Sequence, residues 1–226
     1  MLEAVAPDLW CAAVDLRFLG VHMGTRMTVV RLGDGTLWVH SPIAITDALR
    51  AEVDALGEVA HLVAPNLFHH LFVGQWKAAY PDATMWLAPG LERKRRDLVA
   101  DPHGVVTLGT APPPWGAEIA QAPLTGFSFH EVLFHHRASR TLVSSDLLEN
   151  FSGSPYVFTR AYLKLAGLYG RVGVSRVLRW AYRDRPAVKE ALARVLAWDF
   201  DRIVIAHGAI VEHDAKRALA EAYAWL

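Results

Sequence analysis

Short apolar runs alternate with amphipathic segments along most of the chain. The apolar runs 27–32 and 36–40 flank Gly33-Asp34-Gly35 and predict a β-hairpin. The run Val59–Ala64, which ends before Pro65, predicts a buried strand. Further strands are predicted at 84–88, 118–122, 131–136, 141–145 and 202–206. Helices are predicted at 46–56, 72–80, 91–100, over most of 158–198, and at 214–226.

This order of elements predicts an α/β protein with two sheets and helices outside them. The first half is rich in strands, and a helical insert over 151–198 precedes the last strand. We find no short-period repeat and no low-complexity tract. The whole of 1–226 is therefore expected to form a single domain that contains this insert.

Composition narrows the classes of function. The 226 residues are 53% hydrophobic and 20% charged, which excludes a disordered chain. The 23 basic and 23 acidic side chains give a formal net charge of zero, so nucleic-acid binding is not expected. A single cysteine, Cys11, excludes a disulfide framework and a cysteine-rich zinc module.

The sequence predicts a cytoplasmic protein without a transmembrane segment. Near the N-terminus, charged residues interrupt the apolar positions, so the pattern of a signal peptide is missing. The longest uncharged run, Val59–Trp76, has 18 residues, but it contains three histidines, a proline and an asparagine. Transfer of these polar groups into lipid would cost free energy, so this run is not expected to cross a membrane. The pattern leaves the oligomeric state open.

Three predicted strands end in side chains that can bind metal ions. Val59–Ala64 leads to His69 and His70, 141–145 leads to Asp146, and 202–206 leads to His207. In layered α/β folds, ligands gather at the carboxyl ends of strands. Imidazoles with a carboxylate suit zinc, iron or manganese, so the three endings together predict a metal site.

Each of these features also has a structural interpretation. Adjacent histidines often decorate the end of a helix, an aspartate after a strand is commonly a cap or turn residue, and His-Gly is a common turn. Neighbouring residues of a strand point to opposite faces. His69 and His70 could therefore serve one site only from a loop or a first helical turn, which Pro65 favours.

The order of these motifs resembles the metallo-β-lactamase superfamily. Its pattern is a His-x-His-x-Asp-His loop after a strand, a later Asp at a strand end, and a His-Gly after the final strand. Residues 141–146 and 203–208 resemble the last two motifs, and His70 resembles the final histidine of the first. The resemblance covers about 25–210 and implies an αββα four-layer sandwich with the metal between the sheet edges.

A divergent branch of that superfamily, a domain of unknown function, is the most similar. Its Glu-Val-x-Phe-x-His stretch, followed by Ser-x-Thr-Leu, is similar to residues 131–142. The first two histidines of the loop motif have no equivalent here. They fall on Pro65 and Leu67 or, after a shift by one, on Asn66 and Phe68. Ser145 replaces the glycine before the aspartate.

These departures imply one metal ion, or an altered pair, in place of the superfamily's two zinc ions. The expected metal is zinc, with iron or manganese as alternatives. The first-choice ligands are His69, His70, Asp146 and His207, and the second-choice ligands are His136 and Glu131. Glu131 and His136 compete, because they point to opposite faces of an alternating strand.

The resemblance implies a metal-dependent hydrolase acting on a small-molecule ester, amide or phosphoester. Asp146 would be catalytic, by orienting the attacking water. Two alternatives stay open: a scaffold that kept the fold and lost the chemistry, and a di-iron redox protein.

In the insert, 160–194 carries nine basic and two acidic residues with interleaved aromatics. It is interpreted as a solvated cap, as a lid for an anionic substrate, or as a membrane or nucleic-acid contact.

Overall fold

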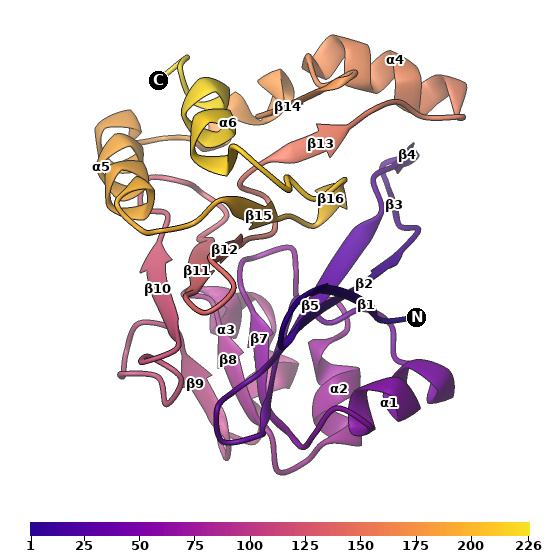
Figure 1. Ribbon diagram of the computed structural model, residues 1–226, viewed down its shortest axis with the longest axis vertical. Helices are drawn as coiled ribbons and strands as arrows, with labels where there is room; N and C mark the ends of the chain where they lie inside the picture. The colour runs from indigo at the N-terminus through magenta and orange to yellow at the C-terminus, as the bar shows by residue number, and fades with distance from the viewer.

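The computed structural model describes residues 1–226, and its largest sheet has seven strands (Figure 1). In spatial order these are β1 (Glu3–Ala6), β2 (Leu9–Val14), β5 (Thr25–Arg31), β6 (Leu37–His40), β7 (Val59–Ala64), β8 (Thr84–Leu87) and β9 (Val105–Thr107). The pairs from β1 to β6 are antiparallel and those from β6 to β9 are parallel. The carboxyl ends of β6 and β7 therefore meet at one edge.

A second sheet has four strands, and the protein also has two smaller sheets. The four strands are β10 (Ile119–Pro123), β11 (Val132–His136), β12 (Thr141–Val143) and β15 (Arg202–Val204). One smaller sheet contains, in spatial order, β14 (Arg171–Gly173), β13 (Glu149–Phe151) and β16 (His207–Gly208). The other is the hairpin of β3 (Arg17–Phe18) and β4 (Val21–His22). Because β12 and β15 are parallel, the segments that follow them, with Asp146 and His207, leave the sheet at the same edge.

The helices lie outside the two main sheets. They are α1 (Asp47–Asp54), α2 (Val73–Ala79), α3 (Leu91–Lys94), α4 (Val157–Ala166), α5 (Arg185–Leu196) and α6 (Ala215–Ala222), with 3₁₀ turns η1 (Arg96–Val99) and η2 (Arg176–Ala181). The Thr46 side chain accepts a hydrogen bond from the Leu49 N–H and so caps α1. No helix combines the length and the apolar character needed to span a membrane.

Three hydrophobic layers hold the sandwich together. The middle layer joins the two main sheets and contains Trp38 and Trp86 from one and Phe134 and Val204 from the other. An outer layer lies between the seven-stranded sheet and helices α1 and α2. The other lies between the four-stranded sheet and helices α5 and α6. This is the αββα arrangement that the sequence predicts.

The structure departs from the predicted elements in three respects. Strands β1, β2, β3, β4, β9, β13 and β16 were not predicted. The helix predicted at 91–100 is interrupted at Arg95, whose side chain turns to bond Asp97 and His70. The insert contains α4, η2 and α5, but it also contributes β14, which pairs with β13. The insert predicted over 151–198 is therefore mostly helical, and this short strand, which depends on a partner outside the helices, interrupts it.

Candidate metal centre

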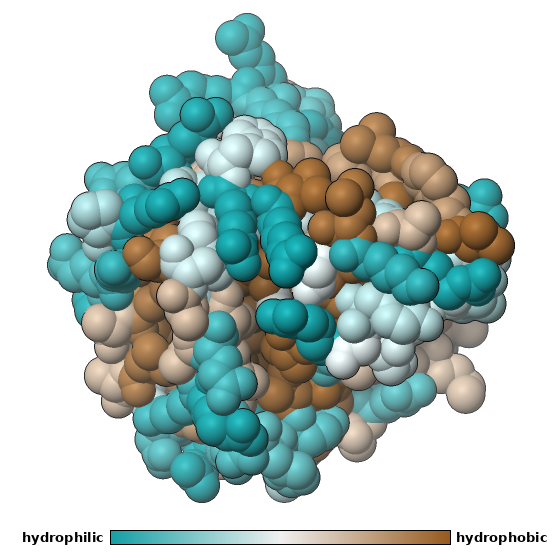
Figure 2. Space-filling model, turned by 90° about the horizontal axis from the view of Figure 1, so that it is seen from above, coloured by the Kyte–Doolittle hydropathy of each residue, from teal (hydrophilic) through white to brown (hydrophobic).

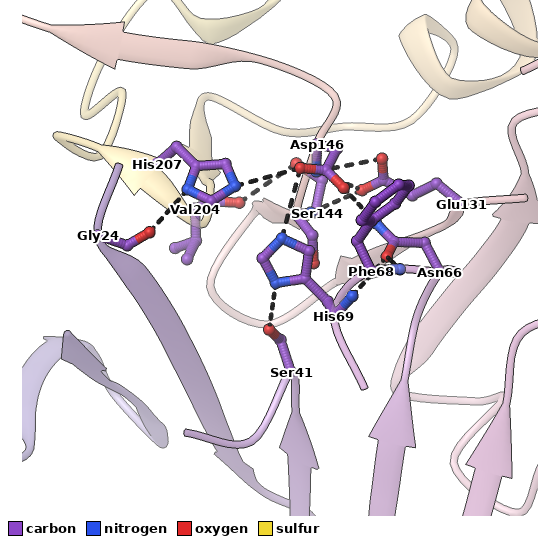
Figure 3. A network of polar contacts seen from close by, with 11 residues as sticks. Gly24, Ser41, Asn66, Phe68, His69, Glu131, Ser144, Asp146, Val204 and His207 are labelled. Carbon is purple, nitrogen blue, oxygen red and sulfur yellow. Dashed lines mark hydrogen bonds and ion pairs between the residues drawn. The ribbon is translucent and has the colours of Figure 1, made fainter. Parts of the chain in front are cut away.

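His69, Asp146 and His207 converge between the two sheets (Figure 3). Their nearest ligand atoms all lie within 4.8 Å of one another. Asp146 Oδ1 is 3.4 Å from His69 Nε2 and 3.2 Å from His207 Nε2. None of the three side chains is more than 12% exposed. Segments that are far apart in the sequence thus place two imidazoles around one carboxylate oxygen.

Asn66 organises the loop that carries His69. Its Oδ1 accepts hydrogen bonds from the backbone N–H groups of Phe68 and His69, both at 2.8 Å. Its Nδ2 donates to Asp146 Oδ2 at 2.7 Å. A buried asparagine therefore fixes the loop and occupies one oxygen of Asp146, which leaves Oδ1 directed at the histidines.

The far nitrogen of each histidine also has a fixed partner. His207 Nδ1 donates to the carbonyl oxygen of Gly24 at 2.9 Å, since a carbonyl can only accept. In a neutral ring this places the lone pair on Nε2, the atom that faces Asp146. His69 Nδ1 lies 2.8 Å from Ser41 Oγ. Such partners orient the ring of a metal-binding histidine.

Glu131 lies behind the site and supports its backbone. It is fully buried and accepts hydrogen bonds from the backbone N–H groups of Ser145, at 2.6 Å, and of Asp146, at 3.1 Å. Burial and the charge of Asp146 raise the pKa of Glu131 well above its ordinary value. Its oxygens are thus engaged with the turn after β12, so Glu131 positions Asp146 and does not face the histidines.

The charges within the cluster favour an ionised Asp146. Burial alone would raise the pKa of this carboxyl, but the charges and hydrogen bonds of His69 and His207 outweigh burial and hold it well below its usual range. Burial lowers the pKa of His207, but its hydrogen bond and charge interaction with Asp146 raise it more. An ionised carboxylate is the form that binds a metal ion.

The structure does not bring His70 or His136 to this cluster. His70 Nδ1 accepts a hydrogen bond from Arg95 Nη1 at 2.9 Å, on another side of the loop. Burial and the nearby Lys94 and Arg95 charges lower the pKa of His70 to about 4. His136 pairs with Thr141, at the end of β12 remote from Asp146. Of the six predicted ligands, three converge.

Glu149 is a buried carboxyl near the site that the sequence analysis missed. It lies opposite His207 in the pairing of β13 with β16. Its Oε2 has no hydrogen-bond partner, and burial raises its pKa to about 7. Glu149 follows two leucines in the sequence, a context that gives no sign of a functional acid.

The geometry of the cluster fits a single metal ion. Ligand atoms about 2.0–2.2 Å from a tetrahedral zinc are about 3.3–3.6 Å apart. The two separations between histidine nitrogen and Asp146 oxygen, 3.4 and 3.2 Å, are close to that edge length. Three protein donors with one open position are typical of catalytic zinc sites. Residues 1–226 contain no second group of three or more such donors.

Comparison with known proteins agrees with this architecture. Residues 7–164 match the family model described as a domain of unknown function, DUF4336. No curated protein matches the sequence. Among solved structures, the DIM-1 metallo-β-lactamase has a TM-score of 0.68 at 13% identity, with 100% of this chain and 97% of that chain covered.

Two further structures show the same likeness. A metallo-β-lactamase from Pontibacter korlensis has a TM-score of 0.66 at 10% identity, with 99% of this chain and 98% of that chain covered. The Flv1 flavodiiron core from Synechocystis sp. has a TM-score of 0.66 at 13% identity, with 100% of this chain and 60% of that chain covered. At such identities the likeness establishes the fold, and it confirms the predicted sandwich of metallo-β-lactamase type.

Proposed function

Because the chain belongs to the DUF4336 family of unknown function and has the metallo-β-lactamase fold, we propose that it is a metal-dependent hydrolase. Its site would hold one metal ion through His69, Asp146 and His207. The observation that carries this proposal is the spacing of the three donor atoms, which lie within 4.8 Å of one another in a buried setting. Zinc is the expected metal, with iron or manganese as alternatives.

The residues around the site would each have a defined task. A metal ion with an open position supplies a water of lowered pKa and polarises a carbonyl or phosphoryl oxygen. Asp146 Oδ1 points into the site while Asn66 holds Oδ2, so this carboxylate would bind the metal ion through Oδ1 alone. Gly24 and Ser41 hold the far nitrogens of the two histidines.

A groove beside His207 supports a small-molecule substrate. It has a volume of about 310 Å³, within the size range of ligand pockets. Gly24 and Gly208, which adjoin His207 by a hydrogen bond and by sequence, both line it. Its polar lining includes Arg26, which donates to the carbonyl oxygens of Ile205 and Gly208, and His22, which pairs with Asp15.

The test uses two neighbouring histidines as a matched pair. Purified protein is expected to contain one equivalent of metal and to hydrolyse at least one chromogenic ester, amide or phosphoester in a chelator-sensitive way. His69→Ala should lose both the metal and the activity. His70→Ala should keep both, because His70 faces Arg95. Protein that takes up no metal when supplied with zinc, iron or manganese would refute the proposal.

A non-catalytic scaffold is the second candidate. Asn66 supports it, because this loop is held by amide hydrogen bonds where a His-x-His pair would supply further ligands. Metal uptake without hydrolysis of any of the three substrate classes would favour this candidate. A di-iron redox protein would need a second group of donors, and an iron absorption band with oxygen consumption would identify it.

A further inference from the structure

Helix α4 exposes an apolar face to solvent. Val157, Phe158 and Leu165 are 72%, 62% and 73% exposed. The opposite face, with Leu163 and Ala166, is buried in the protein. Large apolar side chains exposed on the outer face of a helix are normally covered by a partner or by another apolar phase. Figure 1 shows α4 at the upper edge of the molecule.

The apolar surface extends beyond α4. Seven of the thirteen large hydrophobic residues that the protein exposes lie between 156 and 180, and they are Tyr156, Val157, Phe158, Leu165, Tyr169, Val177 and Trp180. Leu19, at the tip of the β3–β4 hairpin, is exposed next to Gly20, which lies against Phe158. We call these eight side chains the α4 surface. Exposed apolar groups gathered in one region mark an interaction site.

The same region is strongly cationic. Residues 150–183 contain no acidic residue and six basic ones, which are Arg160, Lys164, Arg171, Arg176, Arg179 and Arg183. The whole chain has a net charge of zero, so the rest of the protein carries a net charge of −6. Figure 2, which views the molecule from above, shows hydrophobic and hydrophilic side chains side by side on this face. The segment 150–183, which carries most of the α4 surface, is therefore positive, and the remainder of the chain is negative.

We propose that the α4 surface binds the face of a membrane rich in anionic phospholipid. Val157, Phe158 and Leu165 would enter the boundary between headgroups and acyl chains, as the apolar faces of interfacial helices do. The surrounding Lys and Arg side chains would meet the lipid phosphates and carboxylates. The net negative remainder of the protein would then face away from the membrane.

The aromatic residues of the region fit this position. Lys164 Nζ lies 5.4 Å from the ring centre of Tyr169, and the Arg183 guanidinium lies 5.2 Å from that of Trp180. Tyrosine and tryptophan are enriched at the level of lipid headgroups, where one end of the ring is apolar and the other is wet. Cations beside them would lie at the depth of the lipid phosphates.

Two other occupants agree less well with the surface. A second copy of this chain, packed through the same surface about a two-fold axis, would bring two groups of six positive charges together. A nucleic acid would match the charge, but it gains little from exposed aliphatic side chains such as Val157 and Leu165. The lipid surface is the occupant that uses both the charge and the aliphatic groups. The proposal does not depend on the metal site.

The test is flotation of the full-length protein with vesicles. We expect binding to phosphatidylcholine vesicles that contain about 30% phosphatidylserine, with affinity about tenfold lower for phosphatidylcholine alone and reduced by salt. The double variant Val157→Ser/Leu165→Ser and the double variant Lys164→Glu/Arg171→Glu should each bind at least about tenfold more weakly. Arg93→Glu, on an exposed side chain of α3, is a charge-reversal control outside the α4 surface and should bind as the parent does.

Thermal melting by circular dichroism should show that all variants fold. No binding to the anionic vesicles at low salt would overturn the proposal. Binding that Val157→Ser/Leu165→Ser leaves unchanged, together with tighter binding to single-stranded RNA, would overturn it in favour of a nucleic acid. A dimer in sedimentation experiments that the same variant abolishes would overturn it in favour of a second copy.

Discussion

His40 should make the stability of this protein depend on pH. Its ring stacks on Trp38 and packs against the edge of Phe134, and neither ring nitrogen has a hydrogen-bond partner. Burial, with a smaller effect of His69, lowers the pKa of His40 to about 3. The folded protein therefore holds this imidazole neutral, whereas the unfolded chain protonates it near its ordinary pKa of 6.5.

The size of the effect follows from this difference. Above about pH 6.5 both states are neutral at His40, and its contribution to stability is constant. Between about pH 6.5 and pH 3 the unfolded chain binds the extra proton, so the free energy of unfolding falls as the pH falls. At pH 5, about 1.5 units below the unfolded pKa, the loss should be about 2 kcal/mol. Below pH 3 it should stop growing.

The assay compares urea unfolding of the parent and His40→Leu at pH 7 and pH 5. The variant should lose about 2 kcal/mol less than the parent between these two values, because leucine cannot take up a proton. His103→Ala, at an exposed histidine, serves as the control and should behave as the parent does. Equal losses in the parent and in His40→Leu would refute the reasoning.

Three further substitutions test how the site is built. Ser41→Ala should weaken metal binding by about 10–100-fold without lowering the melting temperature, because it removes the partner of His69 Nδ1; unchanged affinity in calorimetric titration would contradict this role. Gly208→Ala should destabilise the fold by more than about 3 kcal/mol, because the new Cβ would lie 2.0 Å from Asn150 O and because φ at this position is +90°. A melting temperature equal to that of the parent would contradict this expectation. Asn66→Ala should cost about 1–3 kcal/mol in urea unfolding, because it leaves two loop N–H groups without their acceptor; an unchanged midpoint would contradict its role in the loop.

The strands that position the site were predictable because they are continuous apolar runs. Val59–Ala64, Thr141–Val143 and Arg202–Val204 each appear in the structure within the predicted ranges. Buried parallel strands need no alternation, so such runs identify them. Strand β1 was not predicted, because Glu3–Ala6 is a short edge strand with no buried residue.

The choice between His69 and His70 could not be made from the sequence. The two are adjacent, and their directions are set by Asn66, which turns the loop, and by Arg95, which holds His70 from the break between α3 and η1. The role of Glu131 also depends on a distant partner, because it binds the backbone N–H of Ser145, fourteen residues later in the chain, in the turn after β12. The local sequence pattern was enough to predict where the three strands end. Which side chains at those ends reach the metal site depends on hydrogen bonds between residues far apart in the sequence.

The most direct test of the proposed metal site is anomalous diffraction from crystals grown with zinc. We expect one strong peak about 2.0–2.2 Å from His69 Nε2, Asp146 Oδ1 and His207 Nε2. The direct contacts that now join Asp146 to the two histidines, at 3.4 and 3.2 Å, would become edges of the coordination sphere. Zinc bound only elsewhere, with these contacts retained as hydrogen bonds, would contradict the account.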